Sequence, residues 1–254
     1  MIIMPSAVRS YKAYIIHLAR SQPRKENIDR LKSRIVFPTQ VVRAVDNRWL
    51  LPEDIERHVG RKLYRPSYPF TVNRNEVACF LSHRKVWTAI IEDGVDAGLV
   101  VEDDASITDD FGKSLDLACS FIRDGYIIRF PHRDHRELGP VVVQEGRHQL
   151  IEPKVVGLGA VAQLISRGAA RRLLRLTDQF DRPVDTFLQM KWVTGVRSFS
   201  MQPSGIREIS DELGGSTLKH DKTILGKLSR EILRPIYRGQ VRVYSARTPD
   251  PMPS

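Results

Sequence analysis

The chain has little of three things that define other classes of protein, beginning with cysteine. Neither of its two cysteines, Cys79 and Cys119, belongs to a CxxC pair or to a Cys/His spacing typical of zinc sites. This argues against a disulfide framework and makes a reducing compartment the expectation. Aromatic residues make up only 7% of the sequence, whereas single-strand nucleic-acid binders interleave exposed rings with basic residues. We therefore expect no nucleic-acid partner, despite a net charge of +10.

Long apolar runs are scarce as well. No segment approaches the length needed to cross a membrane, and the N-terminal sequence lacks the basic start and apolar stretch of a signal peptide. We expect a cytoplasmic protein.

With 254 residues, of which 41% are hydrophobic, the chain can bury one sizeable core. We predict one catalytic domain over residues 1–221, followed by a basic amphipathic tail over 222–254. From Lys219 onward eight Lys and Arg residues oppose three carboxylates, so half of the net charge lies there. This pattern suits an interfacial helix broken near Pro235, which would place the protein peripherally on the anionic inner leaflet. A helix packed on the catalytic domain is the alternative.

Strand and helix patterns alternate along the chain. Apolar and β-branched runs predict strands at 14–18, 40–45, 99–101 and 126–130. Apolar residues at helical spacing predict helices at 21–35, 76–92, 110–123 and 166–176. Two further segments are less regular: a proline-rich excursion at 47–74 and a strand pair, or tight strand and turn, at 155–165. The alternation predicts an α/β fold, a three-layer α/β/α arrangement around a mostly parallel central sheet.

Three consecutive carboxylates, Glu102, Asp103 and Asp104, end the apolar run at 99–101. Like charges this close need a compensating cation, a helix N-terminus or open water. In an extended chain Glu102 and Asp104 project to the same face while Asp103 points away. Mg²⁺ and Mn²⁺ prefer oxygen ligands and take their remaining positions from water and substrate phosphates. The triplet therefore predicts a divalent metal that holds a phosphorylated substrate, with a solvated acidic turn as the alternative.

Asp185 follows a proline and sits among apolar residues in the segment Pro183-Val-Asp-Thr-Phe-Leu188. Burial beside apolar groups raises the pKa of a carboxylate and suits it to general-base chemistry near neutral pH. A helix-capping role is the competing interpretation, and both roles can coexist.

Several other polar residues are expected around a nucleotide. Arg20 and Arg24 flank the start of the first predicted helix, a place suited to a diphosphate. Asp46 ends the second predicted strand, and His220 follows a glycine-containing loop that could close over a bound ligand and complete a metal shell. We assign the following residues to donor binding: His17, Arg20, Arg24, Asp46, Ser82, His83 and Asp103.

Six segments, in this order, resemble glycosyltransferase family 25, the bacterial lipooligosaccharide galactosyltransferases, which are also similar to the catalytic half of collagen galactosyltransferases. They are Tyr14-Ile-Ile-His-Leu-Ala-Arg-Ser21 with Arg24, Glu76-Val-Ala-Cys-Phe-Leu-Ser-His83 with Trp87, Val100-Val-Glu-Asp-Asp104, Gly159-Ala-Val-Ala-Gln-Leu-Ile-Ser166 with Ala169, Pro183-Val-Asp185 and Leu218-Lys-His-Asp221. The sequence departs from the family pattern at His17, Pro23 and Asn75, where Asn, Glu and Gly are common.

The resemblance implies a GT-A architecture, a nucleotide-sugar donor that is usually UDP-galactose, and inversion at the anomeric carbon. It implies a divalent cation, Mn²⁺ or Mg²⁺, held by Glu102 and Asp104. From the residues themselves we expect Asp185 to act as the base and His220 to add a metal or phosphate contact from a loop that orders when donor binds. The acceptor would be a lipid-linked saccharide or an oligosaccharide in lipopolysaccharide or other surface polysaccharide synthesis.

Two alternatives stay open. One is a metal-dependent nucleotidyltransferase or phosphohydrolase, for which neither a second carboxylate set nor a glycine-rich phosphate loop is evident. The other is a catalytically inactive glycosyltransferase-like binding protein.

Overall fold

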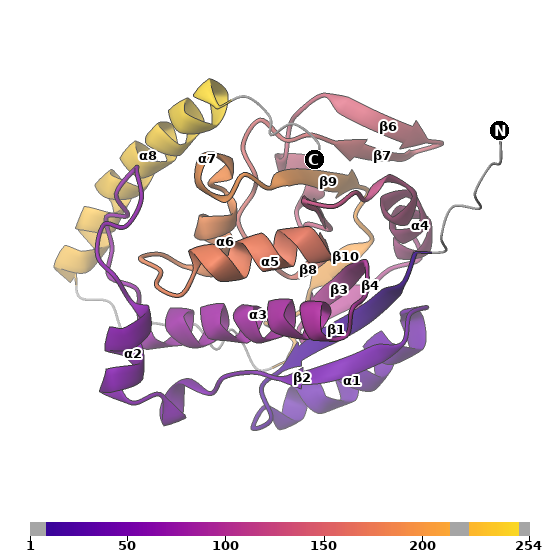
Figure 1. Cartoon of the computed structure of the whole chain (residues 1–254), viewed down its shortest axis with the longest axis horizontal. Helices are drawn as coiled ribbons and strands as arrows, with labels where there is room; N and C mark the ends of the chain where they lie inside the picture. Colours follow the sequence, from indigo (N-terminus) through magenta and orange to yellow (C-terminus); the bar gives the residue numbers. More distant parts are fainter. Residues whose placement is uncertain (1–8, 214–223, 249–254) are drawn as a thin grey trace.

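The computed structural model describes residues 9–213 and 224–248, with only the backbone described for 224–230. Strands and helices alternate through most of this range (Figure 1). The strands are β1 (Tyr11–His17), β2 (Thr39–Arg43), β3 (Ala97–Glu102), β4 (Ala105–Ile107), β5 (Tyr126–Arg129), β6 (Val141–Glu145), β7 (His148–Ile151), β8 (Ala162–Ser166), β9 (Arg197–Gln202) and β10 (Ile206–Glu208). The α-helices are α1 (Gln22–Arg34), α2 (Pro52–His58), α3 (Arg74–Glu92), α4 (Phe111–Phe121), α5 (Arg167–Leu176), α6 (Val184–Leu188), α7 (Lys191–Thr194) and α8 (Ile224–Arg247), with 3-10 turns η1 (Asn47–Trp49) and η2 (Asp134–Arg136).

One eight-stranded sheet, in the order β2-β1-β3-β8-β5-β9-β7-β6, forms the centre. The pairs β1/β2 and β1/β3 are parallel, as predicted. Beyond β3 the sheet is mixed, because β8 runs antiparallel between β3 and β5 and a β6–β7 hairpin closes the far edge. In the parallel part, Ile16 pairs with Glu102 and His17 with Arg43. The C-terminal ends of β1, β2 and β3 therefore meet at one edge.

Helices cover both faces of the sheet, which confirms the predicted three-layer organisation (Figure 1). Side chains alternate along β1: Ala13 and Ile15 belong to the core with α1 and α4, whereas Tyr14 and Ile16 belong to the core with α3 and α5. Both cores contain fully buried residues. The packed sheet therefore holds the ends of its strands in fixed positions.

The helix starts follow from local chemistry. Asn73 accepts hydrogen bonds from the backbone N–H groups of Asn75 and Glu76, and the Glu76 carboxylate accepts one from Asn73 N–H, so a capping box starts α3. Ser166 caps α5 by accepting from Ala169 N–H. Ser21 occupies the N-cap position of α1, but its side chain makes no capping bond. A proline in the first turn favours the start of this helix, because its fixed φ suits that position and its missing N–H would have no partner there.

The two less regular segments, 155–165 and 47–74, can be compared with the structure in turn. Of the two alternatives for 155–165, the structure has a single strand, β8, preceded by a loop, so the strand pair is wrong and the strand-and-turn alternative is the nearer one. The excursion at 47–74 is irregular with short helices, as predicted.

The tail contains one continuous helix, α8, with Pro235 inside it, so the predicted break is wrong. Tyr237 is buried, its hydroxyl accepts a hydrogen bond from Arg182 Nη1 at 2.8 Å, and its ring meets Tyr68 edge-on. Ser245 donates to the Lys154 carbonyl at 2.8 Å. These contacts favour the packed-helix alternative for residues 231–248. Among the described residues, no helix is long and apolar enough to cross a membrane.

Candidate active site at the acidic strand end

A pocket opens where β1, β2 and β3 end, beside the first half of α3. Parallel strands place their C-terminal ends together, and α/β proteins bind ligands there. Most of the residues predicted to bind donor or metal line this pocket, together with Cys79 and Glu208. They are Arg20, Arg24, Ser82, His83, Glu102, Asp103 and Asp104.

The acidic triplet turns a corner after Glu102. β3 ends at this residue, and Asp103 and Asp104 lie in the turn before β4, so strict alternation does not apply to them. Asp103 lines the same pocket as Glu102 and Asp104 and differs from them in its partners, not in strand alternation. Its carboxylate contacts His17 Nδ1 at 2.8 Å and Arg24 Nη1 at 2.7 Å, and it accepts from Leu18 N–H at 3.3 Å. Asp103 is therefore held inside the protein and positions the turn.

The positive charge of Arg24 partly compensates the three carboxylates of the triplet. Its Nη1 lies 2.7 Å from Asp103 and 3.1 Å from Asp104, and the whole side chain is buried. We predicted that Arg24 binds the nucleotide directly. The geometry favours a different role, in which Arg24 pairs with Asp103 and Asp104. One guanidinium does not neutralise three carboxylates, so the cluster keeps net negative charge.

Asp104 is the least satisfied member. Its Oδ1 is buried and has no hydrogen-bond partner among the described residues. Burial, reinforced by Glu102, raises the pKa of Asp104 to about 7, while Arg24 acts in the opposite direction and Asp103 and Glu208 add to the increase. A buried oxygen of this kind is poised to receive a proton or a cation.

The raised pKa predicts a pH-dependent stability. Since the folded protein holds this proton more tightly than the unfolded chain, the stabilisation is full below the unfolded pKa of 3.8 and is lost as pH rises through about 7. Without divalent cations, Asp104→Asn should raise the melting temperature at about pH 8 and leave it nearly unchanged at about pH 4. Thermal denaturation in chelator measures this; a variant less stable than wild type at the higher pH would contradict the assignment.

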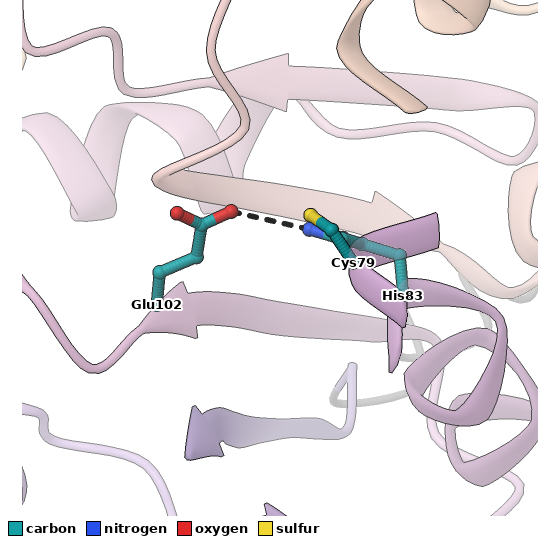
Figure 2. Close-up of side chains that lie close together, drawn as sticks. All are labelled: Cys79, His83 and Glu102. Atoms are coloured by element: carbon teal, nitrogen blue, oxygen red, sulfur yellow. Dashed lines mark hydrogen bonds and ion pairs between the residues drawn. The ribbon is translucent and has the colours of Figure 1, made fainter. Parts of the chain in front are cut away.

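Cys79, His83 and Glu102 form a second donor group that shares Glu102 with the triplet (Figure 2). Cys79 and His83 are one turn apart on α3, and one ligand atom from each residue lies within 4.8 Å of the others. His83 Nε2 is 3.2 Å from Glu102 Oε1, and its buried Nδ1 has no partner in the described part of the chain. Burial raises the pKa of the Cys79 thiol, and nearby carboxylates, Glu102 first, add to this. The thiol is therefore protonated unless a cation binds it.

Of the remaining residues predicted to bind donor, some line the pocket and others hold the lining residues in place. Arg20 lines the pocket, and its guanidinium donates to Asp46 at 2.9 Å and to Asn47 at 3.2 Å. Asp46 also caps η1 through Arg48 N–H, so it orients Arg20 rather than facing a ligand. Ser82 accepts from Val45 N–H at 2.8 Å and donates to the Ala78 carbonyl, which ties α3 to the end of β2.

Asp185 lies in an adjoining pocket that shares Cys79, Glu102 and Glu208 with the first. Its Oδ2 accepts from Gly159 N–H at 3.1 Å, and its Oδ1 accepts from Thr186 N–H at 2.7 Å. The residue sits in the first turn of α6, whose N-cap position is Pro183, and no side chain caps this helix, so the capping interpretation is wrong. Its carboxylate is held in a fixed orientation in this second pocket.

Cys79 and Glu208, two potential ligands that line the pocket, were not predicted, and one predicted residue cannot be placed. Cys79 carries a sequence signal, since a Cys and a His four residues apart on a helix share a face. Glu208 carries none, because only the pairing of β10 with β4 brings it to the acidic turn. His220 lies outside the described residues.

Comparison with known proteins adds to this geometry. The family model described as glycosyltransferase family 25 (LPS biosynthesis protein) matches residues 10–188, which include the triplet and Asp185. The chain belongs to glycosyltransferase family 25.

Family 25 relatives include proteins with contrasting names. The chain is 28% identical over 216 residues to "Inactive glycosyltransferase 25 family member 3" of Mus musculus, covering 76% of this chain and 36% of that protein. It is 32% identical over 107 residues to "Procollagen galactosyltransferase 2" of Homo sapiens, covering 40% of this chain and 17% of that protein. The chain thus spans little more than a third of the length of the mouse relative. A solved structure titled as a mannose-1-phosphate geranyltransferase from Thermus thermophilus aligns with a TM-score of 0.36 at 10% identity, covering 76% of this chain and 73% of that one, a likeness too slight to assign a function.

Proposed function

We propose that this family 25 protein is a metal-dependent, inverting glycosyltransferase that transfers galactose from UDP-galactose to a saccharide acceptor of lipopolysaccharide or another surface polysaccharide. The observation that carries the proposal is Asp104. Its Oδ1 is buried and has no hydrogen-bond partner among the described residues. Asp104 belongs to the acidic cluster at the strand ends and lines a pocket that adjoins the pocket holding Asp185. An electronegative, partly unsatisfied cluster suits a cation and the diphosphate that comes with it.

The donor set fits such a cation. Glu102 and Asp104 offer carboxylate oxygens, and Glu208 lines the same pocket, which matches the oxygen preference of Mn²⁺ and Mg²⁺. Glu102 and Asp104 would hold the ion, with His220 as an additional ligand. When bound, a divalent cation would neutralise the diphosphate leaving group.

The chain's own residues supply the other parts of the mechanism. Asp185 would accept the proton of the acceptor hydroxyl as that oxygen attacks the anomeric carbon from the face opposite the diphosphate. The two backbone N–H groups that bind Asp185 fix its orientation without consuming all of its lone pairs. Arg20 would bind the nucleotide or its phosphates, with His17, Asp46 and Asp103 supporting that end of the pocket. Ser82 and His83 would shape the donor pocket.

The two donor groups that share Glu102 make different predictions for metal binding. If Mn²⁺ binds the oxygen set, Glu102→Gln should weaken it about tenfold or more, whereas Cys79→Ser should change it by less than about twofold. Mn²⁺ titration followed by electron paramagnetic resonance measures both. Strong loss of binding in Cys79→Ser, or a sulfur-to-metal absorption band with Co²⁺, would place the ion on the Cys79–His83–Glu102 group instead.

The proposed reaction is tested with purified full-length chain, Mn²⁺ and a panel of nucleotide sugars. UDP-galactose should raise the melting temperature and release UDP slowly by hydrolysis, whereas the same sugars without cation should do neither. If no nucleotide sugar binds or turns over under either condition, the proposal fails.

A binding protein without transferase activity is the second candidate. Arg24 favours this candidate, because its buried guanidinium contacts Asp103 and Asp104 and so reduces the negative charge that the cluster offers to a cation. Such a protein would bind UDP-galactose equally well with and without Mn²⁺ and would release no UDP. Metal-dependent UDP release in the panel distinguishes the two candidates.

The partners follow from the reaction. The acceptor would be a lipid-linked saccharide or an oligosaccharide, and peripheral association with the inner leaflet would bring the protein near a lipid-linked acceptor. Binding of the full chain to anionic and neutral vesicles tests this placement.

A further inference from the structure

The pocket that holds Asp185 is rimmed by arginines. Arg234, Arg238 and Arg242 follow one another at single-turn spacing on α8, which runs along one edge of the molecule (Figure 1). Arg133 and Arg136, beside and within η2, line the same pocket from a different part of the chain. All five side chains belong to exposed residues.

The arginines have no counter-ion in the described part of the structure. No hydrogen bond or ion pair of their guanidinium groups is found there. The pocket also contains carboxylates, but each already has a partner. Glu137 pairs with Arg129 and Ser200. Glu208 Oε2 lies 3.2 Å from His132 Nε2, and Glu102 Oε1 lies 3.2 Å from His83 Nε2. Glu76 closes the α3 capping box, and Asp185 accepts the hydrogen bonds described above.

Guanidinium groups that line a concavity without an ion-pair partner among the described residues point to an anionic ligand. Arginine binds phosphate oxygens through paired, charge-assisted hydrogen bonds. The donor diphosphate is assigned to the neighbouring pocket, so it does not account for these five residues. A flat anionic membrane would engage arginines on an open face, whereas these line a pocket from two separate segments.

We propose that the acceptor is a phosphorylated saccharide, whose phosphate is bound by Arg133, Arg136, Arg234, Arg238 and Arg242 while a free hydroxyl reaches Asp185. This inference rests on the proposed function for the role of acceptor, but the phosphate site itself is measured without any sugar transfer.

The test compares two variants of the full chain with equal loss of charge. The pocket variant is Arg234→Gln/Arg238→Gln/Arg242→Gln. The control is Arg30→Gln/Arg171→Gln/Arg247→Gln, which removes three exposed arginines that do not line the pocket. Glucose 6-phosphate, glucose and inorganic phosphate serve as probes, with saturation-transfer and phosphorus NMR as the readouts, and UDP-galactose with Mn²⁺ is titrated separately.

Glucose 6-phosphate should bind wild type and the control alike, and the pocket variant about tenfold more weakly. It should also bind wild type more tightly than glucose or inorganic phosphate. Equal binding to both variants, or inorganic phosphate binding as tightly as glucose 6-phosphate, would overturn the inference. So would a pocket variant that loses only its binding to anionic vesicles, since the arginines would then serve a membrane. Failure of UDP-galactose to bind any form would instead count against the proposed function and leave the phosphate result standing.

Discussion

Replacing Asp104 with asparagine should reduce cation-dependent sugar transfer by about a hundred- to a thousandfold. The substitution keeps the size of the side chain and removes the charge from the one buried carboxylate oxygen of the triplet that has no partner among the described residues. Because Asp104 is predicted to act on the cation and leaving group, the loss should appear in kcat and in Mn²⁺ affinity together. Steady-state kinetics across a Mn²⁺ titration measure both.

A matched control separates this effect from a general loss of acidity. Asp109→Asn removes a carboxylate from a highly exposed residue nearby, whose contact is a surface pair with Arg34 at 3.1 Å. It should retain wild-type rates, because surface pairs contribute little. Full activity in Asp104→Asn would show that the cation, if any, does not depend on this residue.

Replacing Asp185 with asparagine should lower kcat by about a hundred- to ten-thousandfold, the range attributed to a general base. The KM for donor should change by no more than about twofold, because Asp185 faces the adjoining pocket rather than the nucleotide end. An amide cannot take up the proton of the acceptor hydroxyl. Kinetics with saturating acceptor, paired with a direct titration of donor binding, check this split.

Asparagine also has one acceptor oxygen where aspartate has two. It therefore loses a partner for either Gly159 N–H or Thr186 N–H, at a cost of about 1 to 3 kcal/mol in stability. A denaturation curve must accompany the kinetics, and Asp178→Asn, on an exposed carboxylate paired with Arg84, is the matched control. Loss of donor affinity in Asp185→Asn, equal to its loss of kcat, would indicate a structural role instead of a base.

The parallel half of the fold could be predicted because its signals are local. Tyr14 and Ile16 share a face of β1, and Asn73 with Glu76 starts α3, so pattern and capping give these elements directly. The mixed half depends on contacts distant in sequence. β8 lies between β3 and β5 in an antiparallel sense, and β9 pairs with β5 across a long insertion. No short-range pattern specifies such neighbours.

The candidate site shows the same division. The acidic triplet and the Cys79/His83 spacing are visible in the sequence, but their partners are not. Arg24 turns inward onto Asp103 and Asp104, which the position of Arg24 beside a helix start did not reveal. Glu208 reaches the site only through the β10/β4 pairing, and the five arginines share a pocket because α8 docks through Tyr237 onto Arg182. Charge compensation is decided by tertiary packing, so residue type alone leaves it open.

The most direct test of the proposed function is a crystal structure of the full chain soaked with Mn²⁺ and UDP-galactose. We expect Glu102 and Asp104 to hold the cation, UDP-galactose to lie in the pocket at the acidic turn, and its galactose to be directed toward the pocket that holds Asp185. A cation bound elsewhere, with UDP-galactose away from the acidic turn, would contradict it.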